Sequence, residues 1–432
     1  MRKDRKCRGR KRGFCLLCMI LAMIYLLSGC SKSSETKTSK KEEVTSIPVT
    51  FLINPATNLS ENQELVEGFN ARYQGIYEAE VEWLTESASG YREKLKQWNV
   101  LDEMPVIITD AGFDYDFYRL LVENKRLVDL KPYMEAIPEW KASIKPEIQK
   151  ECTEESGEIY LAPLGSEIKS YAGIIYNKEL LRLAGYETFP ETWEEFWKCL
   201  DALKALGVTP ISLHGSGSYW VPMLFATSYI YGIRDGKTFL DEDFPDSYQN
   251  PEMEGMLAML DRMYGYTFED AVEIDYDEAA ERFCDGKAAI FANGYWMIEE
   301  LPENVKGKLQ FAPFPGNILM NSPRMSAWAM TAGYDAKVTD GAAKLLAFRV
   351  QQDQENTQRL MNQEDLSSVE DTYISAVKKN KMVMPNYQMK WEQEIQNDFF
   401  TENLPGYLEG DVDAKTLLKR MDERLTEIRA KK

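Results

Sequence analysis

The sequence predicts an α/β fold built as two domains or as one large bilobal unit. Apolar runs of strand length alternate with helical patterns between residues 48 and 123, which is typical of helices layered on a mostly parallel sheet. Residues 105–110 (PVIITD) form a short, continuous apolar run of the kind found in a buried parallel strand. The chain has 432 residues, 44% of them hydrophobic and 12% aromatic, so it can bury a large core.

The elements of the first part follow from hydrophobic periodicity. Residues Leu65, Val66, Phe69 and Tyr73 recur at helical spacing, whereas residues 79–84 alternate as in a strand. In chain order we expect a strand at 48–54, the helix that contains Leu65, strands at 79–84 and 105–110 on either side of a helix at 91–101, and a helix at 116–123.

The rest of the chain gives a similar mixture. Thr192 and Glu195 have the spacing of a capping box, and Gly207 and Pro210 end the helix that follows. We also expect a strand-rich segment at 157–176, a short helix from Asn177, a strand at 208–213, helices and loops over 214–271, a helix at 279–284, a strand at 288–292, and helices at 295–301, 342–352 and 414–428.

The amino terminus predicts export. Residues 1–13 hold eight Lys or Arg, and residues 14–27 are an apolar run of about 14 residues, too short to span a bilayer. The ending of this segment, Leu27-Ser28-Gly29-Cys30, resembles the lipobox of bacterial lipoproteins. The resemblance implies cleavage after Gly29 and a lipidated Cys30, with residues 1–29 as signal peptide and 30–48 as anchor and flexible tether.

Composition excludes some classes of ligand. Residues 1–29 hold eight of the 51 basic residues and one of the 70 acidic residues, so the rest of the chain carries a net charge of −26. This balance argues against nucleic acid, which is bound through basic side chains. Apart from the anchor Cys30, the exported chain keeps Cys152, Cys199 and Cys284 and one histidine, His214. This set predicts neither a disulfide framework nor a metal site. We expect no cofactor.

Several motifs together resemble the extracellular solute-binding proteins of ABC importers, the sugar-binding family 1 group. The motifs, in order, are 127–130 (LVDL), 157–163 (GEIYLAP), 173–180 (GIIYNKEL), 184–185 (AG), 192–196 (TWEEF), 207–211 (GVTPI), 283–290 (FCDGKAAI), 294–296 (GYW) and 311–316 (FAPFPG). Each motif alone is weak, but their order and spacing are specific.

The resemblance implies a two-lobed, periplasmic-binding-protein-like fold of the class II type, with the ligand in a cleft and closure by hinge motion. It implies lobe 1 at 49–165 plus 288–326 and lobe 2 at 166–287 plus 327–432, with chain crossings near 163–172, 286–292 and 323–331. It also implies a monomer, anchored by its lipid on the extracellular face of the cell membrane, that passes a sugar to the transmembrane subunits of an ABC permease.

A sugar site needs flat aromatic rings for the C–H faces and carboxylates or amides for the hydroxyl groups. We therefore expect ligand contacts from residues that follow strands or lie at the crossings and family motifs. They are Asn54, Asp110, Phe113, Asp114, Glu167, Lys169, Tyr171, Trp220, Trp296 and Trp328. Other interpretations are helix capping for Asp114, an interlobe ion pair for the 167–171 group, and a structural role for His214.

The sequence offers little support for catalysis. The sequence has no Gly-x-Ser-x-Gly elbow, residues 232–238 (GIRDGKT) are one residue short of a phosphate-binding loop, and the acidic run at 241–246 lacks the pattern of a calcium loop. We expect no catalytic residue. The alternatives are a surface-anchored glycoside hydrolase, whose paired carboxylates could lie among the many acidic residues, and a binding protein for a solute other than a sugar.

Overall fold

The computed structural model describes residues 44–52, 59–84, 88–111, 114–166, 168–216, 218–242, 245–380 and 382–431. Every described residue belongs to the compact unit formed by residues 43–432. The predicted signal segment and Cys30 therefore lie outside the described residues. The end of the predicted tether is instead part of a strand, because β1 begins at Thr45 and the side chain of Ile47 is fully buried.

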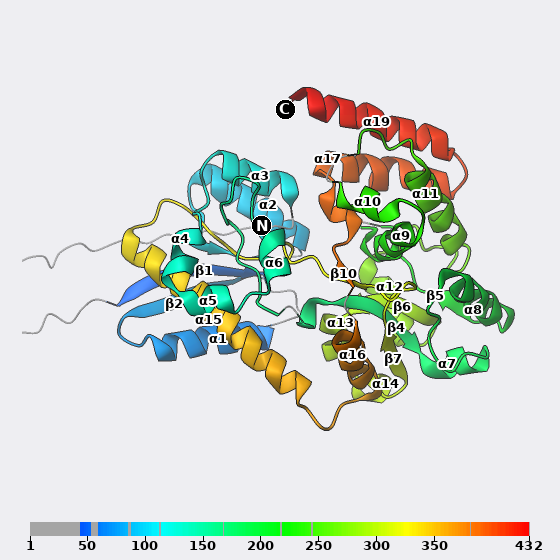
Figure 1. The fold of residues 1–432 in the computed structure, drawn as a ribbon, viewed down its shortest axis with the longest axis horizontal. Coiled ribbons are helices and arrows are strands. Elements are labelled where there is room, and N and C mark those ends of the chain that lie inside the picture. The colour runs from blue at the N-terminus through cyan, green and yellow to red at the C-terminus, as the bar shows by residue number, and fades with distance from the viewer. Residues whose placement is uncertain are drawn as a thin grey trace, which may run out of the picture. The chain divides into compact units, whose positions relative to one another are not determined.

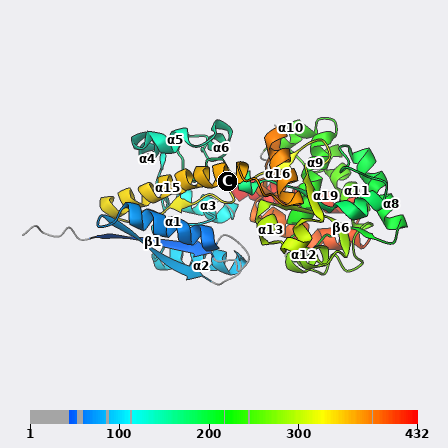
Figure 2. The same cartoon turned by 90° about the horizontal axis from the view of Figure 1, so that it is seen from below.

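The first lobe is built on a four-stranded sheet of order β2-β1-β3-β9. Its strands are β1 (Thr45–Leu52), β2 (Tyr77–Leu84), β3 (Ile107–Ile108) and β9 (Ala329–Met330); β1 is parallel to β2 and β3, and β9 is antiparallel to β3. Its helices are α1 (Leu59–Arg72), α2 (Ala88–Leu101), α3 (Tyr115–Glu123), α4 (Lys131–Ala136), α5 (Pro138–Ala142), α6 (Pro146–Glu151) and the long α15 (Ala336–Met361). Figures 1 and 2 show α15 beside α1 and β1.

The second lobe is built on a six-stranded sheet of order β10-β8-β4-β6-β5, with β7 also paired to β4. Its strands are β4 (Ala172–Asn177), β5 (Thr209–Ile211), β6 (Ala288–Gly294), β7 (Leu309–Ala312), β8 (Leu319–Met320) and β10 (Val383–Met384). Strand β4 is antiparallel to β6, β7 and β8, whereas β5 is parallel to β6 and β10 to β8.

Many helices surround this second sheet. They are α7 (Lys178–Leu183), α8 (Trp193–Ala205), α9 (Trp220–Gly232), α10 (Gly236–Asp241), α11 (Pro251–Tyr264), α12 (Tyr276–Cys284), α13 (Tyr295–Glu300), α14 (Glu303–Lys306), α16 (Ser368–Lys379), α17 (Gln393–Gln396), α18 (Leu404–Leu408) and α19 (Ala414–Lys431). Two 3₁₀ turns (Ile168–Ser170 and Tyr387–Lys390) and a π-helix (Asn397–Asn403) complete the chain. Thr192 caps α8 by accepting a hydrogen bond from the amide of Glu195.

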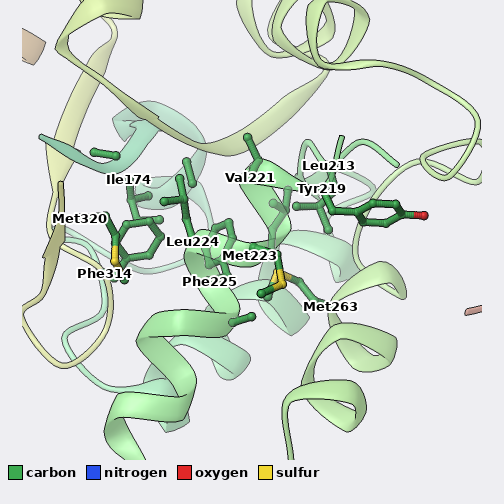
Figure 3. Packing of buried hydrophobic residues seen from close by; sticks show 14 of the residues in the cluster. Ile174, Leu213, Tyr219, Val221, Met223, Leu224, Phe225, Met263, Phe314 and Met320 are labelled. Carbon is green, nitrogen blue, oxygen red and sulfur yellow. The ribbon is translucent and has the colours of Figure 1, made fainter. Parts of the chain in front are cut away.

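Each lobe has its own apolar core. In the second lobe Phe225 meets Phe314 edge to face at 5.4 Å, and Leu224 and Met320 pack in the same cluster (Figure 3). In the first lobe Ile47 lies in a core with residues of α15. The predicted helices and strands are largely present, but the segment 157–171 contributes an isolated bridge from Ala162 rather than a strand.

Two predicted lobe boundaries are wrong. Segment 288–326, expected in lobe 1, supplies β6, β7 and β8 to the second sheet, because the fully buried β6 pairs with β4 along its length. The start of segment 327–432, expected in lobe 2, supplies β9 and α15 to the first lobe. The crossings are therefore at 163–171, at 321–328 and between α15 and α16. The crossing expected at 286–292 lies within the second lobe.

Candidate functional site

A cavity of about 1200 Å³ lies between the two lobes, and we call it the cleft. Its lining comes from the first lobe, from the second lobe and from the crossing segments. Among the lining residues, Leu224 and Met320 also belong to the core of the second lobe, so a rigid, close-packed surface supports that side of the cleft.

The structure brings five of the predicted site residues together around the cleft. Those that line it are Asp110, Lys169, Trp220, Trp296 and Trp328. Two others, Asp114 and Tyr171, do not line it, and Asn54, Phe113 and Glu167 lie outside the described residues. The lining set comes from both lobes and from two of the crossings.

Asp110 lies two residues after β3, at the carboxyl end of the strand, where α/β folds place ligands. Its backbone φ is +49°, in the left-handed region that Asp tolerates better than most residues. Burial raises the pKa of Asp110 to about 6, although the charges of Arg349 and Arg92 oppose the increase. The site thus holds a carboxyl group that changes charge close to neutral pH.

Trp328 lies under the guanidinium group of Arg349, whose central carbon is 4.1 Å from the ring centroid. Arg349 projects from α15 and donates hydrogen bonds to the carbonyl oxygens of Ala162 (3.2 Å) and Ser326 (3.0 Å). One arginine therefore fixes a cleft tryptophan and two segments at the crossings. Sequence analysis missed Arg349, because a basic residue inside a long amphipathic helix gives no signal of a site.

Trp220 and Trp296 form an aromatic pair on the second-lobe side, with ring centroids 5.6 Å apart. Trp220 is the first residue of α9, and Trp296 is the second residue of α13. Gly294 makes the position of Trp296 possible, because a Cβ at residue 294 would lie 2.0 Å from that indole ring. This contact is a physical reason for the Gly-x-Trp motif.

Lys169 connects the two lobes at the edge of the cleft. Its ammonium group pairs with Glu61 of α1 and, at 2.7 Å, with Glu299 of α13. Burial alone lowers the pKa of Lys169, but the two carboxylates outweigh it and the net shift is upward. Burial and the charge of Glu299 raise the pKa of Glu300 to about 7. The geometry of Lys169 is that of an interlobe ion pair.

Asp114 and Tyr171 have structural partners instead. The carboxylate of Asp114 caps α3 by accepting a hydrogen bond from the amide of Phe117 (3.0 Å), and it pairs with Lys96 at 3.1 Å. Tyr171 is 7% exposed and lies in the second-lobe core, where its hydroxyl accepts a hydrogen bond from Lys145 at 3.4 Å. Both residues are close in sequence to residues that line the cleft, but neither of them lines it.

The cleft wall contains polar atoms that are buried but unpaired within the described part of the chain. They are Tyr219 Oη, Trp220 Nε1, Ser326 Oγ, Gln352 Oε1 and Gln388 Oε1. A buried donor or acceptor without a partner costs about 1–3 kcal/mol, so such atoms favour a ligand or water that can hydrogen-bond to them. Donors and acceptors are mixed, as a hydroxyl-rich molecule requires.

The charged lining is mainly acidic. Seven carboxylates (Glu61, Asp110, Asp277, Glu281, Glu299, Glu300 and Asp353) face three basic groups (Arg92, Lys169 and Arg349). The basic groups lie beside acidic ones, as described for Lys169 and Asp110. The cleft therefore has no excess of positive charge that would attract an anion.

His214 lies behind this wall. Its side chain is fully buried, meets Tyr276 edge to face at 5.7 Å, and has a pKa lowered to about 4 by burial. In the part of the chain that the structure describes, no group of three His, Cys, Asp or Glu side chains could hold a metal ion. No helix within the same residues is both long and apolar enough to cross a membrane.

The three described cysteines differ in burial. Cys152 and Cys199 are buried, whereas Cys284 is half-buried and lines the cleft. Sequence analysis also missed the lining residues after residue 384. They include Gln388, Asn397, Phe400 and Thr401, and they lie in short turns and a π-helix without a recognisable pattern.

Solved structures share this architecture. A chitin oligosaccharide binding protein matches with a TM-score of 0.71 at 19% identity, over 90% of this chain and 99% of that one. A Streptococcus pneumoniae solute-binding protein, solved with the blood group A-trisaccharide, matches with a TM-score of 0.69 at 18% identity, over 89% of this chain and 100% of that one. The sugar-binding protein MalE from Xanthomonas citri matches with a TM-score of 0.66 at 18% identity, over 90% of this chain and 98% of that one. The fold is that of the two-lobed, periplasmic-binding-protein-like proteins.

Sequence comparison gives the family. A multiple sugar-binding protein of Streptococcus mutans serotype c is 25% identical over 187 residues, which are 41% of this chain and 44% of that protein. The match therefore spans less than half of that relative. The profile of the bacterial extracellular solute-binding proteins matches residues 64–384, more than half of the chain. The chain belongs to the bacterial extracellular solute-binding protein family.

Proposed function

We propose that this protein captures an uncharged carbohydrate in its cleft by hinge closure and passes it to an ABC permease. The observation that carries the proposal is the composition of the cleft wall. Indole rings from both lobes, Trp220 and Trp296 on one side and Trp328 on the other, share the wall with buried, unpaired polar atoms. Rings that cover C–H faces and hydrogen-bonding groups that meet hydroxyls are the two requirements of a sugar site.

The charge of the lining supports a neutral ligand. Seven carboxylates against three basic groups repel an anionic ligand such as a sugar phosphate. Asp110 can accept hydrogen bonds from two hydroxyl groups when it is ionised, and Arg349 holds Trp328 in place beside it. The names of the similar proteins, which include binders of chitin oligosaccharide and of a blood group trisaccharide, agree with this class of ligand.

The proposal includes the location of the protein. Cys30, in its lipobox-like sequence, is the predicted lipid attachment site on the extracellular face of the cell membrane, and the protein acts there as a monomer without catalysis. Expression in a bacterial host with labelled palmitate tests the anchor. Label should enter the protein and should be absent from the Cys30→Ala variant, which should also appear in the medium. Label in that variant would contradict the assignment.

Thermal unfolding of the purified protein with a panel of saccharides tests the ligand class. A ligand at about 100 times its dissociation constant adds roughly 2.7 kcal/mol of stability, which is readily measured. The panel contains maltotriose, N,N′,N″-triacetylchitotriose, xylotriose, the blood group A trisaccharide and their monosaccharides, with glucose 6-phosphate and a tripeptide as controls.

A shift with one class of neutral saccharide, recovered intact by chromatography, is the expected result. A saccharide recovered in cleaved form would instead establish a glycoside hydrolase. A shift only with the tripeptide or the sugar phosphate would overturn the carbohydrate assignment while leaving a solute-binding function.

A further inference from the structure

The C-terminal part of the chain contributes its own section of the cleft wall. Gln388 in the 3₁₀ turn Tyr387–Lys390, and Asn397 and Thr401 in the π-helix Asn397–Asn403, all line the cleft. We call these three residues the C-terminal wall. The family profile ends at residue 384, so the C-terminal wall lies in the part of the chain that the profile does not describe.

The π-helix is an unusual element, because i→i+5 hydrogen bonding is rare and is often associated with functional sites. Here Asn403 stabilises it by donating a side-chain hydrogen bond to the carbonyl oxygen of Asp398, five residues earlier, at 2.5 Å. The wider turn leaves both Asn397 and Thr401 exposed in the cleft while Phe400 is buried between them and the core.

Helix α19 holds the π-helix in position. Arg424 donates to both carboxylate oxygens of Asp398, with an Nη2 to Oδ1 distance of 3.2 Å, and Arg420 donates to the amide oxygen of Asn403 at 2.5 Å. A two-point arginine–carboxylate contact fixes orientation as well as distance. Figure 1 shows α19, in red, beside α17 and α11.

The π-helix is also connected to the tryptophan pair. The ring of Phe400 stacks on that of Tyr219 with centroids 5.4 Å apart and planes 13° from parallel, and Tyr219 directly precedes Trp220. The C-terminal wall is therefore placed relative to the aromatic side of the cleft by direct packing.

Gln388 gives an independent indication that this wall meets a ligand. Its side chain is 7% exposed, and its Oε1 has no hydrogen-bond partner within the described residues, although it lines the cleft. Burying an unpaired amide oxygen destabilises the protein, and a ligand hydroxyl that donates to it removes that penalty.

We propose that the C-terminal wall determines which saccharide binds: Gln388 and Thr401 hydrogen-bond ligand hydroxyl groups, and Arg424 acts as a positioning residue through Asp398. The inference rests on the proposed function. The C-terminal wall distinguishes saccharides by the positions of their hydroxyl groups, whereas the tryptophan pair contacts C–H faces that many sugars share. Changes in the wall should therefore alter the order of preference among saccharides.

Calorimetric titration with maltotriose, triacetylchitotriose, xylotriose and the blood group A trisaccharide tests the proposal. Thr401→Val removes the hydroxyl at constant shape and should weaken binding of the preferred saccharide about tenfold, the effect of one neutral hydrogen bond. The order of preference among the four should change, and Thr401→Ser should restore it. Thr416→Val, on the exposed surface of α19, should leave all four affinities unchanged.

Gln388→Met separates a binding role from a structural one. Loss of the unpaired oxygen should leave the melting temperature of the ligand-free protein unchanged or raised, while the affinity falls about tenfold. Arg424→Met should change the order of preference, whereas Lys419→Met, which removes an exposed pair with Glu423 on the same helix, should not.

Two outcomes distinguish failure of this inference from failure of the proposed function. If Thr401→Val and Gln388→Met bind all four saccharides as the wild type does, while Trp220→Ala binds more weakly, the inference is wrong and the proposed function stands. If the wild-type protein binds no saccharide, the proposed function fails and the inference fails with it.

Discussion

The two sides of the cleft differ in chemistry. The first-lobe side carries charged groups, with Asp110 near Arg92 and Arg349 and with Trp328 held under the guanidinium group of Arg349. The second-lobe side carries the Trp220–Trp296 pair and the neutral C-terminal wall, with carboxylates of α12 and α13 but no basic group among its described lining residues. The same ligand would thus meet a carboxyl group beside two arginines on the first-lobe side, and a pair of indole rings together with neutral hydrogen-bonding groups and carboxylates on the second-lobe side.

The difference indicates a division of roles. The affinity that comes from stacking on an aromatic ring changes little when one sugar replaces a similar one. A fixed carboxylate, by contrast, contributes to affinity only when a ligand hydroxyl group points toward it. Substitutions of the tryptophan pair should therefore weaken many ligands alike, whereas substitution of Asp110 should affect fewer ligands and should depend on pH.

Trp220→Ala should have the largest effect. Loss of a buried aromatic contact surface commonly costs at least about 2 kcal/mol of binding energy, or roughly 30-fold in affinity. Calorimetric titration should show this loss for every saccharide that the wild type binds. The control, Trp98→Ala, removes an indole from α2 outside the cleft and should leave affinity unchanged. An unchanged affinity in Trp220→Ala would contradict the proposed role of the aromatic side.

Asp110→Asn should reduce affinity about tenfold or more at pH 8, because a hydrogen bond to a charged acceptor contributes about 1.5–3 kcal/mol. In the wild type, the affinity should rise between pH 5 and pH 7, since the pKa of Asp110 is about 6 and the ionised form accepts hydrogen bonds from the ligand. Titrations at several pH values should show a steeper slope in the wild type than in the variant, in which Glu300, with a pKa raised to about 7, still titrates in the cleft wall.

The stability of the ligand-free protein should have the opposite slope. The pKa of Asp110 in the folded state is above its usual value of 3.8, so the folded state holds this proton more tightly than the unfolded state. The stabilisation is complete below about pH 4 and is lost as the pH rises through 6. Urea unfolding of wild type and Asp110→Asn at pH 4 and 7 should show this difference, and equal pH dependence would contradict it.

The sequence predicts the elements of this fold better than their grouping into lobes. Periodicity locates α2, α8 and β6 because each depends on local spacing of apolar residues. Pairing of β6 with β4 rather than with the first sheet depends on contacts between residues more than 100 positions apart, and no local pattern records them. The lobe predicted for segment 288–326 is wrong because these long-range contacts leave no local pattern in the sequence.

The candidate site shows a similar limit. Asp110, Trp220 and Trp296 could be predicted because they follow strands or match a motif. Arg349 and Gln388 could not, because their place in the cleft depends on the path of α15 and on a turn after residue 384. For Asp114, the capping interpretation agrees with the observed hydrogen bond to Phe117.

Gly294→Ala tests whether the aromatic side needs its exact shape. The new Cβ would lie 2.0 Å from the ring of Trp296, so the indole must move and the Trp220–Trp296 pair must separate. We expect about tenfold weaker binding, since half of the paired surface is displaced. Gly255→Ala in α11, where the nearest atom is 3.7 Å from the new Cβ, is the matched control and should bind normally. Normal binding by Gly294→Ala would mean that Trp296 does not contact the ligand.

Lys169→Gln should have the smallest effect, and it tests the connection between the two sides. Lys169 pairs with Glu61 of the first lobe and Glu299 of the second, so its removal leaves two carboxylates facing each other where the lobes must approach. A partly exposed ion pair contributes about 0.5 kcal/mol, so the loss of both pairs should cost about 1 kcal/mol, which is about fivefold in affinity.

The salt dependence distinguishes this repulsion from a lost ligand contact. Repulsion between partly exposed carboxylates is screened, so the loss in Lys169→Gln should be largest at low ionic strength and nearly absent at 1 M salt. A lost hydrogen bond to the ligand would persist at both concentrations. Lys198→Gln, which removes a cation paired with Glu194 and Glu195 on α8 away from the cleft, should bind normally throughout. A loss of affinity that does not depend on salt would mean that Lys169 contacts the ligand directly. The crossing segment would then contribute a charged group to ligand binding, as the first lobe does.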